Sequence, residues 1–203
     1  MLNEFILLSI AHIFAVASPG ADFAVVLKNT LNSGRKAGVM TAIGVGFGIS
    51  IHMIYTLFGM ALIIAQSEIL FTLVQWVGAG YLLWLAWQGF QSRARQAGEH
   101  KSTLQVTLKS MQAFRQGFLT NVFNPKATAF FLFLFTNLVN PDTPFTIQSL
   151  YGLWLVFYTM LWFSFVAWIF SRQRVLAWYE THGHYFDWAM GVVLVIIALR
   201  MIF

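Results

Sequence analysis

The sequence contains no cysteine and few charged residues. Only 9% of its 203 residues are charged, whereas 59% are hydrophobic. The lack of cysteine excludes disulfide bonds, thiolate metal sites and thiol redox chemistry. A soluble domain has about 25% charged and about 45–50% apolar residues, so this chain has too few polar side chains to cover a surface in water. The composition predicts a protein that lies in a lipid bilayer.

The hydrophobic residues occur in long runs. A helix that crosses the roughly 30 Å hydrocarbon core needs about 20 apolar residues, and six runs meet this length. We therefore predict an all-α integral membrane protein with six transmembrane helices, in which residues 1–203 form a single domain with no room for a soluble one. The predicted spans are Leu2 to Leu27, Ala37 to Ala65, Ile69 to Phe90, Ala113 to Val139, Phe145 to Phe170 and His184 to Phe203.

Most of the 12 Lys and Arg residues lie in the connections after the first, third and fifth spans. The positive-inside rule places these basic loops in the cytoplasm and both termini outside. Because the basic residues are separated by apolar runs, they do not form the clustered basic face of a nucleic-acid-binding domain. They are Lys28, Arg35, Lys36, Arg93, Arg95, Lys101, Lys109, Arg115, Arg172 and Arg174, which leaves Lys126 and Arg200 elsewhere.

Two segments have an ambiguous pattern. Ala15-Val16-Ala17 imitates a signal-peptidase site, but no Lys or Arg precedes it, so we interpret the first span as uncleaved. The segment from Lys101 to Arg115 spaces apolar residues at helical intervals among basic ones. It fits a helix on the cytoplasmic membrane surface and a solvated loop equally well.

Two helix-start signals lie in the middle of apolar runs. Ser18-Pro19 and Asn124-Pro125 each place a preferred N-cap residue before proline, which is well tolerated at the first helical position. A single proline could merely kink a continuous helix, with neighbouring helices repairing the hydrogen bonds. Because the signal occurs in both the first and the fourth span, we predict instead that these two helices are interrupted.

The two interruptions occupy equivalent places in two halves of the chain. The halves are about 1–92 and 113–203, joined by a basic cytoplasmic loop at about 93–112. Each half has an odd number of spans, so the halves would point in opposite directions. This pattern predicts two inverted three-helix repeats, the plan of many secondary transporters, whose interrupted helices form the substrate site. The free N–H groups of each half-helix could bind a carboxylate.

Asp22 and Lys126 follow the two interruptions. An unpaired charge at the centre of a span costs at least about 2.5–3.5 kcal/mol, so we expect both residues to have partners or to line a common cavity. Asp22 could then receive a substrate ammonium or a proton, and Lys126 a carboxylate. A static salt bridge between the two halves is the structural alternative.

Other polar residues in the spans are candidates for lesser roles. His52 is a candidate proton relay with Asp22, and His12 a weaker one. Asn121 is expected to line the cavity or to bond between helices. The glycines Gly44, Gly46, Gly48, Gly78 and Gly80 are expected to allow close helix packing within one chain.

Several motifs resemble the lysine-exporter superfamily, and within it the homoserine/threonine-resistance (RhtB) branch. They are Ser18-Pro19-Gly20-Ala21-Asp22-Phe23, Gly34-Arg35-Lys36-Ala37-Gly38, Gly78-Ala79-Gly80-Tyr81-Leu82 and Gly117-Phe118-Leu119-Thr120-Asn121 with Asn124-Pro125-Lys126. The resemblance covers essentially the whole chain. In the family the first motif commonly reads Pro-Gly-Pro-Asp, and Ala21 stands here for the second proline, which we expect to loosen the first break.

The resemblance implies a multi-pass exporter in the inner membrane that moves amino acids outward, driven by the proton gradient. It also implies that the two proline motifs form the functional core. The predicted substrate-binding residues are Ser18, Pro19, Gly20, Asp22, Asn121, Asn124, Pro125 and Lys126. One acid and one base suit a zwitterion better than a dication, and the resemblance suggests a neutral amino acid such as threonine or homoserine. No cofactor or metal is expected, and the partners are substrate, protons, lipids and conceivably a second copy in a homodimer.

Two other classes of function are less consistent with the sequence. An intramembrane zinc protease would need His-Glu-x-x-His, which is absent. An aspartyl protease would need two aspartates within the spans, whereas Asp187 is predicted near the start of the last one. A channel, or an exporter of another small polar solute, is the main alternative.

Overall fold

The computed structural model describes residues 1–18, 20–66, 68–91, 108–140 and 142–202. Every regular element in these ranges is a helix, which confirms the all-α prediction. The helices are α1 (Leu2–Ala17), α2 (Ala21–Ser33), α3 (Arg35–Gln66), α4 (Glu68–Phe90), α5 (Ser110–Val122), α6 (Pro125–Asn137), α7 (Phe145–Phe170) and α8 (Gln173–Ile202).

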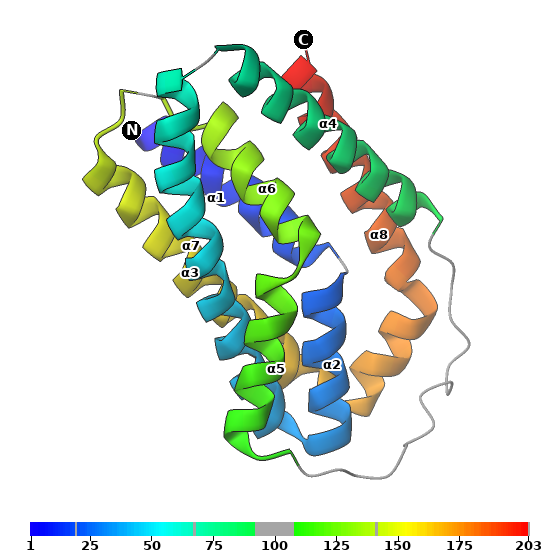
Figure 1. Ribbon diagram of the computed structural model, residues 1–203. Coiled ribbons are helices and arrows are strands. Elements are labelled where there is room, and N and C mark those ends of the chain that lie inside the picture. Colours follow the sequence, from blue (N-terminus) through cyan, green and yellow to red (C-terminus); the bar gives the residue numbers. More distant parts are fainter. Residues whose placement is uncertain (19, 67, 92–107, 141, 203) are drawn as a thin grey trace.

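The first and fourth predicted spans are each divided into two helices. α1 and α2 are bent by 54° relative to each other, and α5 and α6 by 58°. Figure 1 shows these two bent pairs in the middle of the molecule, with α1 near α6 and α2 near α5. Both predicted interruptions are therefore present, and they lie next to each other.

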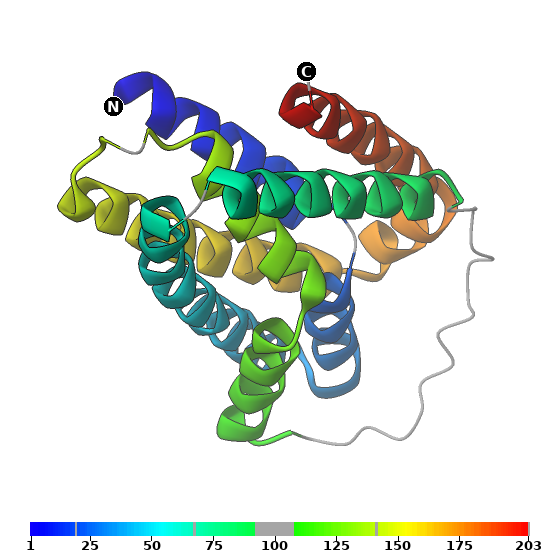
Figure 2. The ribbon, with the colours of Figure 1, turned by 45° about the horizontal axis from the view of Figure 1, so that its top comes forward.

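The remaining helices flank the bent pairs. In Figures 1 and 2, α3 and α7 lie on one side and α4 and α8 on the other. α3 packs mainly along α5 and α7, and α4 packs mainly along α8. The two breaks are thus surrounded by helices, where lipid cannot satisfy their free backbone groups and other protein groups must.

The lengths and composition of the helices fit a membrane protein. Among the described residues, Arg35–Gly59 of α3 and α7 are each long and apolar enough to cross a bilayer, and each bent pair also qualifies if it is taken as one span. Large apolar side chains face outward, as expected for contact with lipid. On α7 they include Leu150, Leu153, Phe157, Leu161, Phe165 and Trp168. The count of six spans stays a prediction.

The last helix is longer than the last predicted span. α8 begins at Gln173 rather than near His184. Hydropathy detects only the apolar part of a helix, and the first third of α8 contains polar residues such as Thr181 and His182. Asp187 consequently lies in the middle of a helix rather than near its start.

The loop after the third span is largely outside the described residues. Only its last part is described, and α5 begins at Ser110, three residues before the predicted span. The expectation of a surface helix from Lys101 to Arg115 therefore stays a prediction up to that point.

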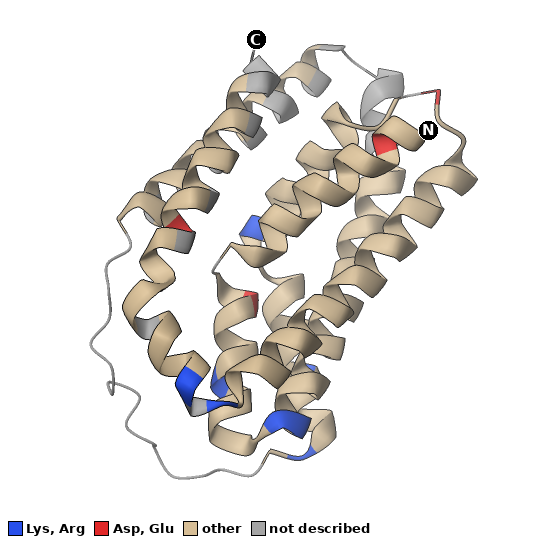
Figure 3. Ribbon diagram, turned by 180° about the vertical axis from the view of Figure 1, so that it is seen from behind, with Lys and Arg blue, Asp and Glu red and all other residues tan. Residues whose placement is uncertain are grey.

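Positive charge gathers at one end of the bundle. Figure 3 shows most of the described Lys and Arg residues at the end where α2 and α7 finish and α5 begins, whereas Figure 1 shows both chain termini at the opposite end. The structure thus separates the basic end from the termini. Which end faces the cytoplasm stays a prediction.

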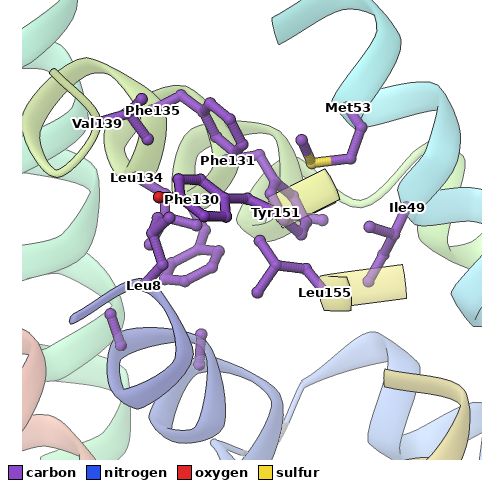
Figure 4. Packing of buried hydrophobic residues seen from close by; sticks show 13 residues of the cluster. Leu8, Ile49, Met53, Phe130, Phe131, Leu134, Phe135, Val139, Tyr151 and Leu155 are labelled. Carbon is purple, nitrogen blue, oxygen red and sulfur yellow. The ribbon is translucent and has the colours of Figure 1, made fainter. Parts of the chain in front are cut away.

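The buried hydrophobic residues of the described ranges form three clusters: a small one where α4, α6 and α8 meet, and two larger ones, one toward each end. The cluster toward the termini, part of which Figure 4 shows, contains Leu8, Ile49, Met53, Phe130, Phe131, Leu134, Phe135, Tyr151 and Leu155 among others. The cluster toward the basic end contains Phe23, Val26, Leu27, Ala42, Val45, Phe163, Val166, Ala167 and Phe170. We call them the terminal-side cluster and the basic-side cluster. The breaks lie at the level where one cluster gives way to the other.

Glycines bring α3 and α5 into backbone contact. A Cβ atom added to Gly44 would lie 2.1 Å from the main-chain oxygen of Phe114, and one added to Gly117 would lie 2.1 Å from that of Thr41. The expected close packing at Gly44, Gly46 and Gly48 is confirmed, because each has a neighbour within 3 Å of such a Cβ. At Gly80 it is wrong, since nothing described lies within 4 Å.

The substitution Gly44→Ala should destabilise the fold. The added methyl group overlaps backbone that cannot rotate away, and overpacking of this kind costs about 1–3 kcal/mol. We expect a lower midpoint of thermal unfolding in detergent and a lower yield of folded protein. Gly80→Ala is the matched control and should leave the midpoint unchanged or slightly raised. Equal midpoints for the two variants would contradict the packing described for α3 and α5.

Candidate functional site

The two breaks are built differently. At the second break, Asn124 is the N-cap of α6, and its Oδ1 accepts a hydrogen bond from the main-chain N–H of Lys126 at 3.0 Å, with Pro125 in the first turn. This is the predicted arrangement. At the first break, the prediction that Ser18 is the N-cap is wrong, because Ser18 ends α1 and Gly20 precedes α2 without a side-chain cap. Pro19 lies outside the described residues.

Asp22 is held by the other break. Its Oδ2 accepts hydrogen bonds from Nδ2 of Asn121 at 3.0 Å and from Nδ2 of Asn124 at 2.9 Å. Hydrogen bonds to an ionised group contribute about 1.5–3 kcal/mol each. Asp22 also lies in the first turn of α2, where the helix dipole favours negative charge. These contacts stabilise a carboxylate at a depth where water is scarce.

Lys126 makes the reciprocal contact. Its Nζ donates a hydrogen bond to the main-chain oxygen of Ser18 at 2.8 Å. Ser18 caps the C-terminal end of α1, where unpaired carbonyl groups attract a cation. This contact offsets the unfavourable position of Lys126 at the start of its own helix. Each break therefore contributes the charged side chain that satisfies the other.

The two charges do not pair directly. In the described part of the chain, the ammonium group of Lys126 and the carboxylate of Asp22 form no ion pair within 4.0 Å of each other. Both instead line the same cavity, with Ser18, Gly20, Asn121 and Asn124. The structure thus brings together all the predicted binding residues except Pro19, which is not described, and Pro125, which does not line the cavity. The static salt bridge considered from the sequence is absent.

The cavity offers free acceptors and free donors. Oδ1 of Asp22 and Oδ1 of Asn121 are buried and have no hydrogen-bond partner among the described residues, and only the oxygen of Asp22 belongs to a carboxylate. Lys126 can donate three hydrogen bonds. The first N–H groups of α2 have no side-chain cap and form the positive end of a helix. This arrangement can bind an ammonium group at Asp22 and a carboxylate at Lys126 and the start of α2.

His52 supports the site from outside the cavity. Its Nε2 lies 2.8 Å from the main-chain oxygen of Asn121, and its Nδ1 contacts the hydroxyl group of Tyr55. An Nε2–H group would donate to that oxygen, which leaves Nδ1 as the acceptor from Tyr55. His52 does not line the cavity. Its contacts hold the end of α5 in place, and the relay role stays a prediction.

Gly48 makes room for Asn121. A Cβ atom at this position would lie 2.7 Å from Cβ and from Oδ1 of the Asn121 side chain. A larger residue would displace the amide that bonds Asp22. α3 therefore positions the second break through both Gly48 and His52.

Two contributors to the site were not found from the sequence. Thr159 of α7 lines the cavity and lies 2.8 Å from Nε2 of His12, but an isolated threonine in an apolar helix gives no signal. Asp187 of α8 interacts electrostatically with Lys126, and the sequence gave no sign of this because Asp187 was considered only as a residue near the start of the last span.

The cavity is small in this conformation. Its volume is about 40 Å³, whereas one water needs a cavity of about 10–15 Å³ and pockets for small molecules measure about 300–1,000 Å³. An amino acid does not fit without movement of the surrounding helices. No group of three or more His, Asp or Glu side chains in the described ranges could hold a metal ion.

Comparisons with known proteins give a consistent result. Residues 13–203 match the family described as LysE type translocator. The uncharacterized membrane protein YahN of Escherichia coli (strain K12) is 34% identical over 188 residues, which cover 92% of this chain and 83% of YahN. The threonine efflux protein of the same organism is 30% identical over 195 residues, which cover 95% of this chain and 94% of that protein. The uncharacterized membrane protein YrhP of Bacillus subtilis (strain 168) is 28% identical, with 89% of each chain covered. No solved structure matches the chain.

Asn124 is both the N-cap of α6 and a hydrogen-bond donor to Asp22, and substitutions should separate these two roles. Serine and aspartate are both good N-caps, so Asn124→Ser and Asn124→Asp keep the start of α6 but lose the hydrogen bond to Asp22. The aspartate also places a second carboxylate beside Oδ2 of Asp22. We expect Asn124→Ser to lower the thermal unfolding midpoint moderately and Asn124→Asp to lower it further. Equal midpoints would contradict the direct contact between Asn124 and Asp22.

Proposed function

Because the chain belongs to the LysE type translocator family, we propose that it is a secondary active exporter of amino acids in the inner membrane. The similarity to threonine efflux proteins along almost the whole chain supports export as the direction of transport. A family of translocators also supports a transporter rather than an enzyme.

The observation that carries this proposal is the free carboxylate oxygen of Asp22 in the same cavity as Lys126 and the uncapped start of α2. An α-amino acid has one ammonium group and one carboxylate. The cavity provides a carboxylate for the first and an ammonium group for the second. A cationic amino acid such as lysine has a second ammonium group, which would lack a partner, and this is costly in a buried site. The proposed substrate is therefore a neutral amino acid of the threonine or homoserine type.

Transport occurs by alternating access between two inverted three-helix repeats, each containing one bent pair. Two features support this. The cavity is too small for the substrate, so the helices around it must move, and a hydrophobic cluster lies on each side of it. Interrupted helices of two repeats that meet at a substrate site are typical of secondary transporters. Opening of one cluster while the other stays closed would expose the site to one side at a time.

The exit of substrate is coupled to the entry of a proton. Asp22 is the residue best placed to take up that proton, because its free oxygen lies in the cavity and would lose its partner when the ammonium group departs. His52 is the second candidate and is linked to the site through Asn121. The basic end of the bundle faces the cytoplasm and the termini face outward, as the positive-inside rule predicts.

The path from the cytoplasm to the cavity lies between α2 and α5. Asn29 of α2 is buried, and its Nδ2 donates hydrogen bonds to Oγ1 of Thr41 at 2.9 Å and to Oε1 of Gln116 at 3.0 Å. Asn29 is seven residues after Asp22 and so lies on the same face of α2, nearer the basic end. Gln116 is exposed. These side chains form a polar seam between α2, α3 and α5.

Replacement of Asp22 by asparagine tests the binding site. Asparagine keeps an oxygen for the amides of Asn121 and Asn124, so the fold should persist, but it cannot neutralise an ammonium group. We expect Asp22→Asn to lose counterflow of threonine in proteoliposomes by at least about tenfold with folded protein retained. Asp142→Asn makes the same chemical change at an exposed position and should leave counterflow unaltered.

Several outcomes would overturn this proposal. Normal counterflow by Asp22→Asn would remove Asp22 from the site. Flux through the wild type that rises without saturation would indicate a channel. Saturable flux of another polar solute, with none of any amino acid, would identify the wrong substrate class.

The cytoplasmic path can be tested by cross-linking, because the chain has no cysteine. In the double variant Asn29→Cys/Gln116→Cys, a short reducible cross-linker should join α2 to α5 and stop transport, and reduction should restore it. Each single variant treated with the same reagent is the control. Transport at the uncross-linked rate by fully cross-linked protein would show that this seam does not open.

A further inference from the structure

A second polar pair lines the cavity away from the breaks. Nε2 of His12 on α1 lies 2.8 Å from Oγ1 of Thr159 on α7, and both residues are completely or almost completely buried, with exposed fractions of 1% and 0%. Both line the cavity that holds Asp22 and Lys126. The pair joins α7 to α1, the helix whose C-terminal end holds Lys126.

The surroundings of this pair are apolar. The ring of His12 lies 5.9 Å from that of Phe130 and 5.7 Å from that of Phe131, between centroids. Ala15 and Phe163 complete the nearby wall. The His12–Thr159 pair is therefore a hydrogen-bonding group in an apolar part of the cavity wall, where a polar part of a substrate could reach it.

His12 and the group that binds Lys126 lie on one helix. His12 lies six residues before Ser18, which corresponds to about 9 Å along the helix axis. The main-chain oxygen of Ser18 accepts the hydrogen bond from Lys126. Because His12, Thr159 and Lys126 line one cavity, a substrate held at Lys126 can present its side chain to the His12–Thr159 pair.

We propose that His12 and Thr159 bind the side-chain hydroxyl group of the substrate and so determine specificity for short hydroxy amino acids. The proposal rests on the function proposed above and adds the recognition of the side chain. A hydroxyl group has one donor and two acceptor positions. After its contact with His12, Thr159 therefore keeps hydrogen-bonding capacity for a substrate hydroxyl. The aromatic wall beside the pair excludes longer side chains.

The test compares threonine with valine, in which a methyl group replaces the hydroxyl. Wild-type protein in proteoliposomes should prefer threonine by at least about tenfold in kcat/KM, because a site built for a hydroxyl group penalises an analogue that lacks one. Thr159→Val should bring the ratio to within about threefold of one, mainly by a loss of threonine transport with valine transport maintained. Thr159→Ser keeps the hydroxyl and should keep most of the preference.

Thr136→Val is the matched control. Thr136 is also a buried threonine in a helix, but its hydroxyl group donates to the main-chain oxygen of Leu132 and it does not line the cavity. This variant should keep the wild-type ratio. A change of the ratio as large as that in Thr159→Val would contradict a specific role for the His12–Thr159 pair.

The failure of this inference is distinguishable from failure of the proposed function. Wild-type transport of both amino acids without preference, or an unchanged preference in Thr159→Val, overturns the inference and leaves export intact. Transport of no amino acid overturns the function itself. If Thr159→Val does not fold, the purified wild type decides the question: threonine should raise its thermal unfolding midpoint more than valine at equal concentration, and equal shifts would overturn the inference.

Discussion

The structure depends on two reciprocal contacts between the interrupted helices. The carboxylate of Asp22 after the first break is held by the amides of Asn121 and Asn124 at the second, and the ammonium group of Lys126 after the second break is held by the carbonyl of Ser18 at the first. Neither break could stand alone in lipid, because its free backbone groups and its charge would lack partners. Together the two breaks form a polar layer, in which these charged groups have hydrogen-bond partners and the remaining free groups face the cavity.

This layer separates two hydrophobic clusters and is fixed from one side by α3. Gly48 provides space for Asn121, and His52 binds its main-chain oxygen, so one helix determines both where the amide lies and how the end of α5 is oriented. The glycine contacts between α3 and α5 make that arrangement rigid. By contrast, α2 contacts α5 through the polar side chains of Asn29 and Gln116. Polar side chains can exchange their hydrogen-bond partners for water or substrate more easily than tightly packed apolar side chains can separate. α5 thus has its close-packed contacts with α3 and its polar contacts with α2. A helix arranged in this way could separate from α2 while it stays packed on α3.

Much of this organisation could be predicted from the sequence, and the errors have physical causes. Asn124-Pro125 is a complete helix-start signal, and the structure has the predicted cap there. Ser18-Pro19 carries the same signal, but α1 continues to Ala17 and Ser18 ends it, so the N-cap of α2 is Gly20, two residues later. The start of α8 was not predicted, because hydropathy measures apolar length and not helix length. Thr159 could not be found at all, since only the fold brings α7 beside α1. The number of spans, the sidedness and the homodimer stay predictions.

The central claim is that the cavity binds both charged groups of one small zwitterion. Competition against counterflow of labelled threonine by two analogues tests it directly: the methyl ester, which lacks the carboxylate, and the N-acetyl derivative, which lacks the ammonium group. The account predicts that unlabelled threonine competes and that each analogue competes at least about tenfold more weakly, because each leaves a buried charge of the protein without a partner. Competition by either analogue as strong as that of threonine would contradict it.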